Sequence, residues 1–166
     1  MRPLSPYFHS NVEIEGTPDL AEPHFLNSGT RDSARLLAEA LISWAQPTSD
    51  YGVFALRGTI PYLLNGNILA AKTFITHFVS ALPSTILNDP STTLAVGSAD
   101  NLILTKDSLV NFSQLTVLTC QRAQGEQNKA MRESWVRLCG TYQSRVGILA
   151  SPEVRRVSIR DVFALV

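Results

Sequence analysis

Residues 51–83 constrain the fold most, because they predict two helices and the tight turn between them. The run YGVFALRGTIPYLLNGNILAAKTFITHFVSALP contains Asn-Gly-Asn at residues 65–67. Gly66 can end the first helix in the left-handed conformation, and Asn67 can cap the second by accepting a free backbone amide. Apolar residues recur along the second helix at helical spacing: Leu64, Ile68, Ala71, Ile75, Phe78, Val79 and Leu82. We therefore expect an antiparallel helical pair whose second helix packs against neighbours on both sides.

Three residues of this pair lie at the offsets that tetratricopeptide-type repeats use. Gly66 ends the first helix, Ala71 lets two helices approach closely, and Pro83 stops the second helix just past Leu82. The aromatic and Leu-Gly signals of the repeat's first helix are missing. Pro61 also lies inside that helix, where a proline removes one amide and favours a kink. The pattern predicts a degenerate repeat unit in place of a regular array.

Further helices are predicted on both sides of this pair from their apolar periodicity and their end signals. Their expected ranges are residues 17–28, 31–46, 107–124, 126–145 and a last helix from about residue 151. The expected capping residues are Thr17, Thr30 or Asp32, Asp50 for the central pair, and Asp107 or Ser108. Residues 1–16 have no apolar period, so we expect an irregular lead-in.

Residues 92–105 differ from the rest of the chain, since they predict strands. Two β-prone runs, 92–96 and 101–105, flank the turn Gly97-Ser98-Ala99-Asp100. This arrangement is typical of a β-hairpin. An isolated hairpin is marginally stable in water, so inside a helical protein it must pack on a helix or pair with another chain. The hairpin is therefore the element that we expect to bind a partner.

Composition and charge narrow the class of protein. The chain has 166 residues, of which 45% are hydrophobic and 17% charged, and this is typical of one globular domain. A formal net charge of zero argues against a general binder of nucleic acid or acidic membranes. Between residues 51 and 105 the charged residues are only Arg57, Lys72, Asp89 and Asp100. This stretch is expected to be deeply buried or to meet a partner.

The sequence predicts no catalytic, cofactor or metal site. Its three histidines are far apart and have no carboxylate or cysteine at ligand spacing, and it carries no nucleophile elbow and no phosphate-binding glycine loop. Cys120 and Cys139 are expected to be buried small hydrophobes in a reducing compartment. The chain shows no signal peptide and no apolar run of the roughly 20 residues that a membrane span needs. We expect a cytosolic protein that does not insert into the membrane.

Four stretches resemble a known family in the same order. They are EPHFLNSGTRDSARLLAEALISWAQ, LRGTIPYLLNGNILAAKTFITHF, SLVNFSQLTVLTCQRAQ and ASPEVRR. Together they resemble the α-solenoid scaffold of the guided-entry pathway for tail-anchored membrane proteins, the Golgi-to-ER traffic factor four family. In that family a YLLLGN turn, an LLNFLQLLLLTCQR helix and a late SPEVR element occupy the equivalent places. Four ordered matches across much of residues 22–156 are more specific than any one of them.

The resemblance implies a non-enzymatic adaptor without a cofactor. Members of the family bridge a cytosolic targeting ATPase, which their N-terminal helices hold, and a ubiquitin-like adaptor protein, which their C-terminal helices and a β-hairpin hold. The resemblance thus assigns binding of the ubiquitin-like adaptor to the hairpin and the helix that follows it. The partner-binding residues expected from this are Leu94, Val96, Leu102, Ile103, Leu104, Phe112, Leu115 and Leu118.

The chain departs from the family in its length and at both ends. It is about half as long and lacks the helical pairs upstream of Gly16, which puts ATPase binding in doubt. Residues 158–166 also lack the aromatic and glycine-containing ending of the family. We expect either a truncated form or a partial gene model.

We therefore expect an all-α fold over residues 17–166, an α-solenoid of tetratricopeptide-like helical pairs with one inserted β-hairpin. The expected function is that of a protein-binding scaffold in the targeting of tail-anchored proteins to the endoplasmic reticulum. One alternative is a generic tetratricopeptide-like adaptor, favoured if the groove ignores the ubiquitin-like protein. A small all-α enzyme is the other alternative, and it would need a deep pocket with convergent acids and a histidine.

Overall fold

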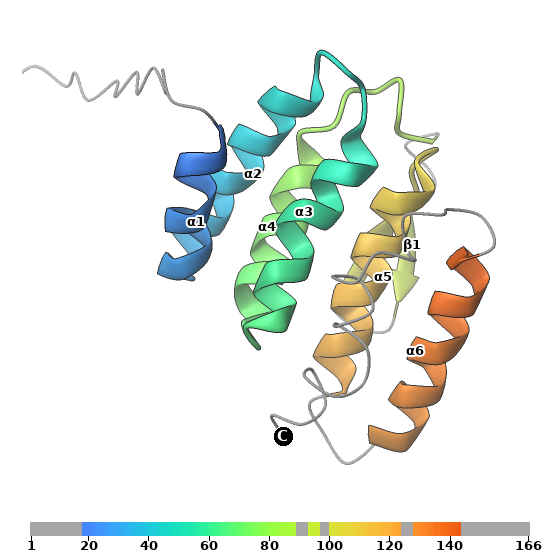
Figure 1. Cartoon of the computed structure of the whole chain (residues 1–166). Coiled ribbons are helices and arrows are strands. Elements are labelled where there is room, and N and C mark those ends of the chain that lie inside the picture. Colours follow the sequence, from blue (N-terminus) through green and yellow to red (C-terminus); the bar gives the residue numbers. More distant parts are fainter. Residues whose placement is uncertain (1–17, 89–92, 97–99, 124–127, 144–166) are drawn as a thin grey trace, which may run out of the picture.

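The computed structural model describes residues 18–88, 93–96, 100–123 and 128–143 of the chain (Figure 1). Within these ranges the helices are α1 (Pro18–Ser28), α2 (Arg31–Ala45), α3 (Tyr51–Leu64), α4 (Ile68–Ser80), α5 (Ser108–Arg122) and α6 (Asn128–Gln143). Two strands, β1 (Thr93–Val96) and β2 (Asp100–Ile103), separate α4 from α5. The predicted all-α fold with one inserted hairpin is confirmed. The predicted lead-in 1–16 and the last helix from residue 151 lie outside the described residues.

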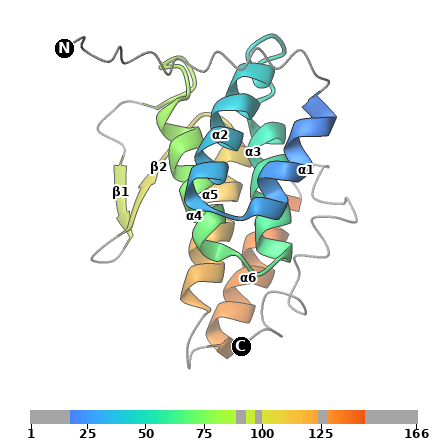
Figure 2. The same cartoon turned by 90° about the vertical axis from the view of Figure 1, so that its left-hand side faces the viewer.

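The helices stack in two layers, as in an α-solenoid. Each of α2 and α3 packs on the helix two places further along the chain, α2 on α4 and α3 on α5. Consecutive helices also pack on one another, and α1 contacts both α2 and α3. One layer therefore holds α1, α3 and α5, and the other holds α2 and α4 (Figures 1 and 2). Helix α6 packs on α5 at the far end of the stack from α1.

The central helical pair forms around the turn that the sequence predicts. Gly66 has a φ of 69°, the left-handed conformation expected of it. Asn67 caps α4, because its Oδ1 accepts the amide of Ala70 at 3.0 Å. Its Nδ2 also donates to the carbonyl of Gly29 at 2.8 Å, which ties the loop between α1 and α2 to the central turn. Helix α4 ends at Ser80, slightly before the predicted position.

The apolar stripe of α4 lies in the core between the two layers. Ala71, Phe74, Phe78 and Val79 are buried, and the ring of Phe74 lies 5.5 Å from that of Phe78 between centroids. A Cβ atom added at Gly58 of α3 would overlap the ring of Phe74. Helices α3 and α4 can therefore approach this closely only because Gly58 has no side chain. The sequence pattern did not indicate this contact between Gly58 and Phe74.

The start of α3 is capped by a residue from another helix. Asp50 occupies the N-cap position, as expected, but its side chain makes no capping hydrogen bond. Instead Asp107 accepts the amide of Gly52 through Oδ2 at 2.9 Å, while its Oδ1 accepts the amides of Leu109 and Val110 at 2.8 and 3.3 Å. One carboxylate thus serves two helix N-termini, where a negative charge is also favoured by the helix dipoles.

Candidate partner-binding site

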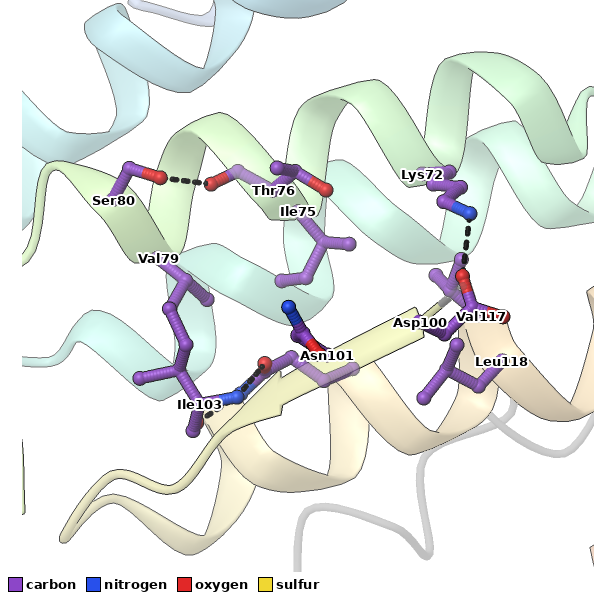
Figure 3. A pocket seen from close by; sticks show the side chains of 11 residues that line it. Lys72, Ile75, Thr76, Val79, Ser80, Asp100, Asn101, Ile103, Val117 and Leu118 are labelled. Atoms are coloured by element: carbon purple, nitrogen blue, oxygen red, sulfur yellow. Dashed lines mark hydrogen bonds and ion pairs between the residues drawn. The ribbon is translucent and has the colours of Figure 1, made fainter. Parts of the chain in front are cut away.

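The candidate site begins with the antiparallel hairpin of β1 and β2, which lies beside α4 and α5 (Figures 2 and 3). Leu94 is opposite Leu102, and Val96 is opposite Asp100. The hairpin is confirmed, although its strands are shorter than expected. Asp100, expected in the turn, begins β2, and Thr105 lies beyond β2 in an isolated bridge with Leu87.

Two amide side chains of α5 close the edge of the hairpin that faces this helix. Gln114 accepts the amide of Ile103 at 3.2 Å and donates to the carbonyl of the same residue at 2.9 Å. Asn111 accepts the amide of Thr105 at 2.9 Å and donates to its carbonyl at 2.7 Å. Because a side-chain amide has both a donor and an acceptor, each one replaces a peptide group of a neighbouring strand. The backbone of this segment is thus fixed to α5 at two points.

Two further side chains hold the turn end of the hairpin. Lys72 of α4 forms an ion pair with Asp100, with 2.7 Å between Nζ and Oδ1. Arg122 of α5 donates from Nη2 to the carbonyl of Val96 at 2.8 Å. The hairpin is therefore fixed to both neighbouring helices before any partner binds, which lowers the conformational entropy that binding would cost.

A groove with a volume of about 230 Å³ lies between the hairpin, α4 and α5 (Figure 3). Its apolar lining comes from all three elements: Ile75, Val79, Ile103, Val117 and Leu118. Figure 3 shows the ion pair of Lys72 and Asp100 at one end of the groove and Ile103 near Val79 at the other. Since the charges at the polar end neutralise one another, the groove is suited to uncharged apolar side chains.

The structure places the eight residues predicted for partner binding at different depths. Leu94 is 49% exposed and Ile103 is 36% exposed. Half-buried positions are Val96, Leu104, Leu115 and Leu118. Leu102 and Phe112 are buried. Strand alternation puts Leu94 and Leu102 on one face of the hairpin and Ile103 on the other, the face that lines the groove.

Phe112 and Leu102, both predicted for partner binding, are buried within the described structure. The ring of Phe112 lies 6.2 Å from that of Trp135 and 5.3 Å from that of Tyr142, so Phe112 joins α5 to α6. Leu102 is only 3% exposed. An apolar helix face shows that a residue is covered, and it does not show whether a partner or another helix covers it. For this reason the apolar pattern of α5 included an interior residue.

Sequence reasoning missed the α4 wall of the groove and the amides that fix the hairpin. Ile75 and Val79 were assigned to the core stripe of α4, yet they also line the groove. Asn111 and Gln114 lie three residues apart, on the face of α5 that also carries Leu115 and Leu118. Two amides at that spacing, directly after a predicted hairpin, were the available signal for a helix that satisfies a strand edge.

Among the described residues, no three or more His, Cys, Asp or Glu side chains lie together so that they could hold a metal ion. Burial, with a smaller effect of nearby Cys139, raises the pKa of the Cys120 thiol to about 12. Burial also raises the pKa of Cys139 to about 11. Both thiols are thus protonated and weakly nucleophilic near neutral pH. In the described ranges no helix is long and apolar enough to cross a membrane.

Comparisons with known proteins give the chain its relatives. A family model described as Golgi to ER traffic protein 4 matches residues 7–158. A curated protein of that name from Aspergillus fumigatus is 29% identical over 119 residues, which cover 70% of this chain and 34% of the relative. The crystal structure of C. therm. Get4 has the same fold, with a TM-score of 0.69 and 24% identity.

The matches cover most of this chain but only part of each relative. The crystal structure covers 88% of this chain, whereas this chain covers 45% of that one. The chain therefore spans less than half the length of the relatives it matches. Since the family model covers nearly the whole sequence, from residue 7 to residue 158, the chain belongs to the Golgi to ER traffic protein 4 family.

Proposed function

We propose that this chain is a protein-binding scaffold in the cytosolic pathway that targets tail-anchored membrane proteins to the endoplasmic reticulum. Its partner in this proposal is the pathway's ubiquitin-like adaptor, which binds at the hairpin and the adjacent groove. Membership of the Golgi to ER traffic protein 4 family supports the pathway. The observation that carries the site is an accessible apolar groove, beside a hairpin that the fold already holds in place.

The scaffold would act by positioning its partner and not by chemistry. Apolar side chains of the adaptor's N-terminal segment enter the groove and contact Ile103 and Leu118, the most accessible of its apolar lining residues. Burial of one aliphatic side chain contributes about 1.5–3 kcal/mol, so a few such anchors are enough for a specific complex. The proposal does not extend to the targeting ATPase, which the family holds with helices that precede the region resembled here.

The decisive variant is Ile103→Asp, which places a charge on the hairpin wall of the groove. Ile103 is 36% exposed, so the free chain can keep the aspartate hydrated, but the complex must bury it. We expect the affinity for the adaptor's N-terminal segment to fall by roughly 30-fold or more. Isothermal titration calorimetry measures this change, with the adaptor's N-terminal segment titrated into the separately purified wild-type or variant chain.

The matched control is Val136→Asp, an equivalent change on the outer face of α6. Val136 is 55% exposed and lines no part of the groove. We expect its affinity for the adaptor segment to equal that of the wild type, with circular dichroism showing the same helicity for both variants. Unchanged binding by a folded Ile103→Asp variant would remove the groove from the interface. A folded wild-type chain that binds no adaptor at all would favour a scaffold for an unrelated partner.

A further inference from the structure

The two edges of the hairpin differ in how their peptide groups are satisfied. On the β2 side, Gln114 bonds the peptide groups of Ile103, and Asn111 bonds those of Thr105 just beyond the strand. Strand β1 forms the other edge of this two-stranded sheet, and no described strand or helix pairs with its outer side. Side chains of α5 thus occupy part of one edge, whereas the other has no strand partner in the described part of the chain.

The direction of each peptide group in β2 follows from its hydrogen bonds. The amide and carbonyl of Ile103 both bond to Gln114, so they face α5. The carbonyl of Leu104 accepts the amide of Asn88 at 3.3 Å, on the opposite side. Because peptide groups alternate in direction along a strand, those of Leu102 also face away from α5 and toward β1.

The same alternation fixes the direction of the peptide groups in β1. Leu94 is the partner of Leu102 in the register, so its amide and carbonyl face β2. The amides and carbonyls of its neighbours Thr93 and Ala95 therefore point out of the hairpin, at the open edge. Thr93 and Ala95 are both exposed, and Leu94 between them is 49% exposed.

An open edge of this kind is a template for another strand. Natural sheets protect exposed edges by keeping the edge strand very short, or with lysine, proline, a bulge or a covering element. Of these devices, the described structure gives β1 only the first, since the strand has four residues. The sequence of β1, Thr-Leu-Ala-Val, has no charge and no proline, and its register with β2 is regular. The outward donors and acceptors of Thr93 and Ala95 match the main chain of an extended segment, and the exposed Leu94 offers that segment an apolar neighbour.

We infer that an extended, uncharged segment of the partner adds to the outer edge of β1 as a third strand. This inference rests on the proposed function and specifies how the same site binds. Main-chain bonds to Thr93 and Ala95 fix the register of the added strand. Its alternate side chains lie beside Leu94 on one face of the enlarged sheet, and the others extend the face that carries Ile103.

The test is Ala95→Pro, with Ala95→Val as its matched control. Proline removes the outward amide and places its ring at the open edge, while the bonds between β1 and β2 are untouched, and proline is tolerated at an edge of this kind. Valine retains the amide and favours a strand. By calorimetry with the adaptor's N-terminal segment, we expect Ala95→Pro to bind about tenfold or more weakly and Ala95→Val to stay within about threefold of the wild type.

Residue-resolved hydrogen exchange of the wild-type chain gives a second readout, which does not depend on how well Ala95→Pro folds. We expect the amides of Thr93 and Ala95 to exchange quickly in the free chain and to become protected in the complex. The amide of Leu94, which faces β2, should be protected in both states. No other mode of binding in the groove predicts this alternation along β1.

Several results would overturn the inference. If Ala95→Pro binds normally and the amides stay unprotected while Ile103→Asp fails to bind, the partner uses the groove without a third strand, and the proposed function stands. If neither variant affects binding, the adaptor binds elsewhere, and both the added strand and the groove fail as its site. If the folded wild-type chain binds no adaptor, the proposed function fails. Protection of Ala95 in the free monomer would assign the edge to another segment of this chain. A dimer of the free chain that Ala95→Pro disperses would assign it to a second copy.

Discussion

Gly58 sets the distance between the two layers of the solenoid at the centre of the core. The ring of Phe74 occupies the place where a side chain of residue 58 would lie, and it packs 6.4 Å from the ring of Tyr62. The sequence drew attention to Ala71, which lies at a known repeat offset and is indeed buried. Gly58 could not be found in this way, because its partner Phe74 belongs to the next helix and no local signal connects the two.

Two glycine-to-alanine variants separate packing from helix propensity. Gly58→Ala should destabilise the chain by about 2 kcal/mol, since overlap with Phe74 outweighs the roughly 1 kcal/mol that alanine gains as a helix former. Gly140→Ala in α6 should stabilise it by about 0.5–1 kcal/mol, because a Cβ there meets nothing within 4 Å. Urea denaturation measures both changes, and equal effects of the two variants would contradict this account.

The ends of the helices and strands show which parts of the fold are encoded locally. The Gly66-Asn67 turn, the Thr30 cap of α2 and the Asp107 cap of α5 follow from neighbouring residues, and each was predicted. The hairpin was also predicted from two short runs and a turn. The second role of Asp107, at the start of α3, was not predictable, because it depends on the stacking of α3 on α5.

A pair of aspartate variants tests this shared cap. Asp107→Ala removes the side-chain acceptor from the first turns of both α3 and α5, and each lost cap costs about 1 kcal/mol, so we expect a loss of about 2 kcal/mol. Asp50→Ala should change stability by less than about 0.5 kcal/mol, since the side chain of Asp50 makes no capping bond. Thermal and urea unfolding compare the two. A large effect of Asp50→Ala would show that the start of α3 is capped differently.

The sequence predicted that the candidate site includes the hairpin, but it did not predict which residues of α4 line the groove. The hairpin was identified because a lone hairpin in a helical protein needs something to pack on, and Ile103 and Leu94 are among its exposed residues. Phe112 was included because the resemblance assigned the whole helix after the hairpin to the partner, and apolar periodicity is the same for a face covered by α6 and a face covered by a partner. Ile75 and Val79, which form the α4 wall of the groove, were assigned only to the apolar stripe that packs in the core.

The stack as a whole is built from neighbour contacts, so its parts need not unfold together. Among the described elements, α6 packs mainly on α5, and Trp135 of α6 is buried against Phe112 of α5. In a solenoid, stability is approximately a sum of repeat stabilities and nearest-neighbour interfaces. Helix α6 can therefore be loosened without loss of the layers formed by α2, α3 and α4.

Trp135→Ala should release α6 selectively. Loss of a buried tryptophan costs about 3–5 kcal/mol, which is more than the local stability expected of one helix held mainly by a single neighbour. We expect the amides of α6 to lose their protection in hydrogen exchange while those of α2 and α4 keep theirs. Val136→Ala, a truncation on the exposed face of α6, is the control and should leave both regions unchanged. Equal loss of protection in every helix would instead indicate one cooperative unit.

The amide closure by Asn111 and Gln114 also sets a limit on self-association. If two chains paired through their β1 edges, the outer boundary on each side would be a β2 edge already occupied by side chains of α5. Such a pair would be isologous, and a third molecule could pair with Ile103 only by displacing its bonds to Gln114. The hairpin thus has one edge open to pairing and one edge that α5 partly occupies, and this asymmetry disfavours the repeated strand addition that forms a fibril.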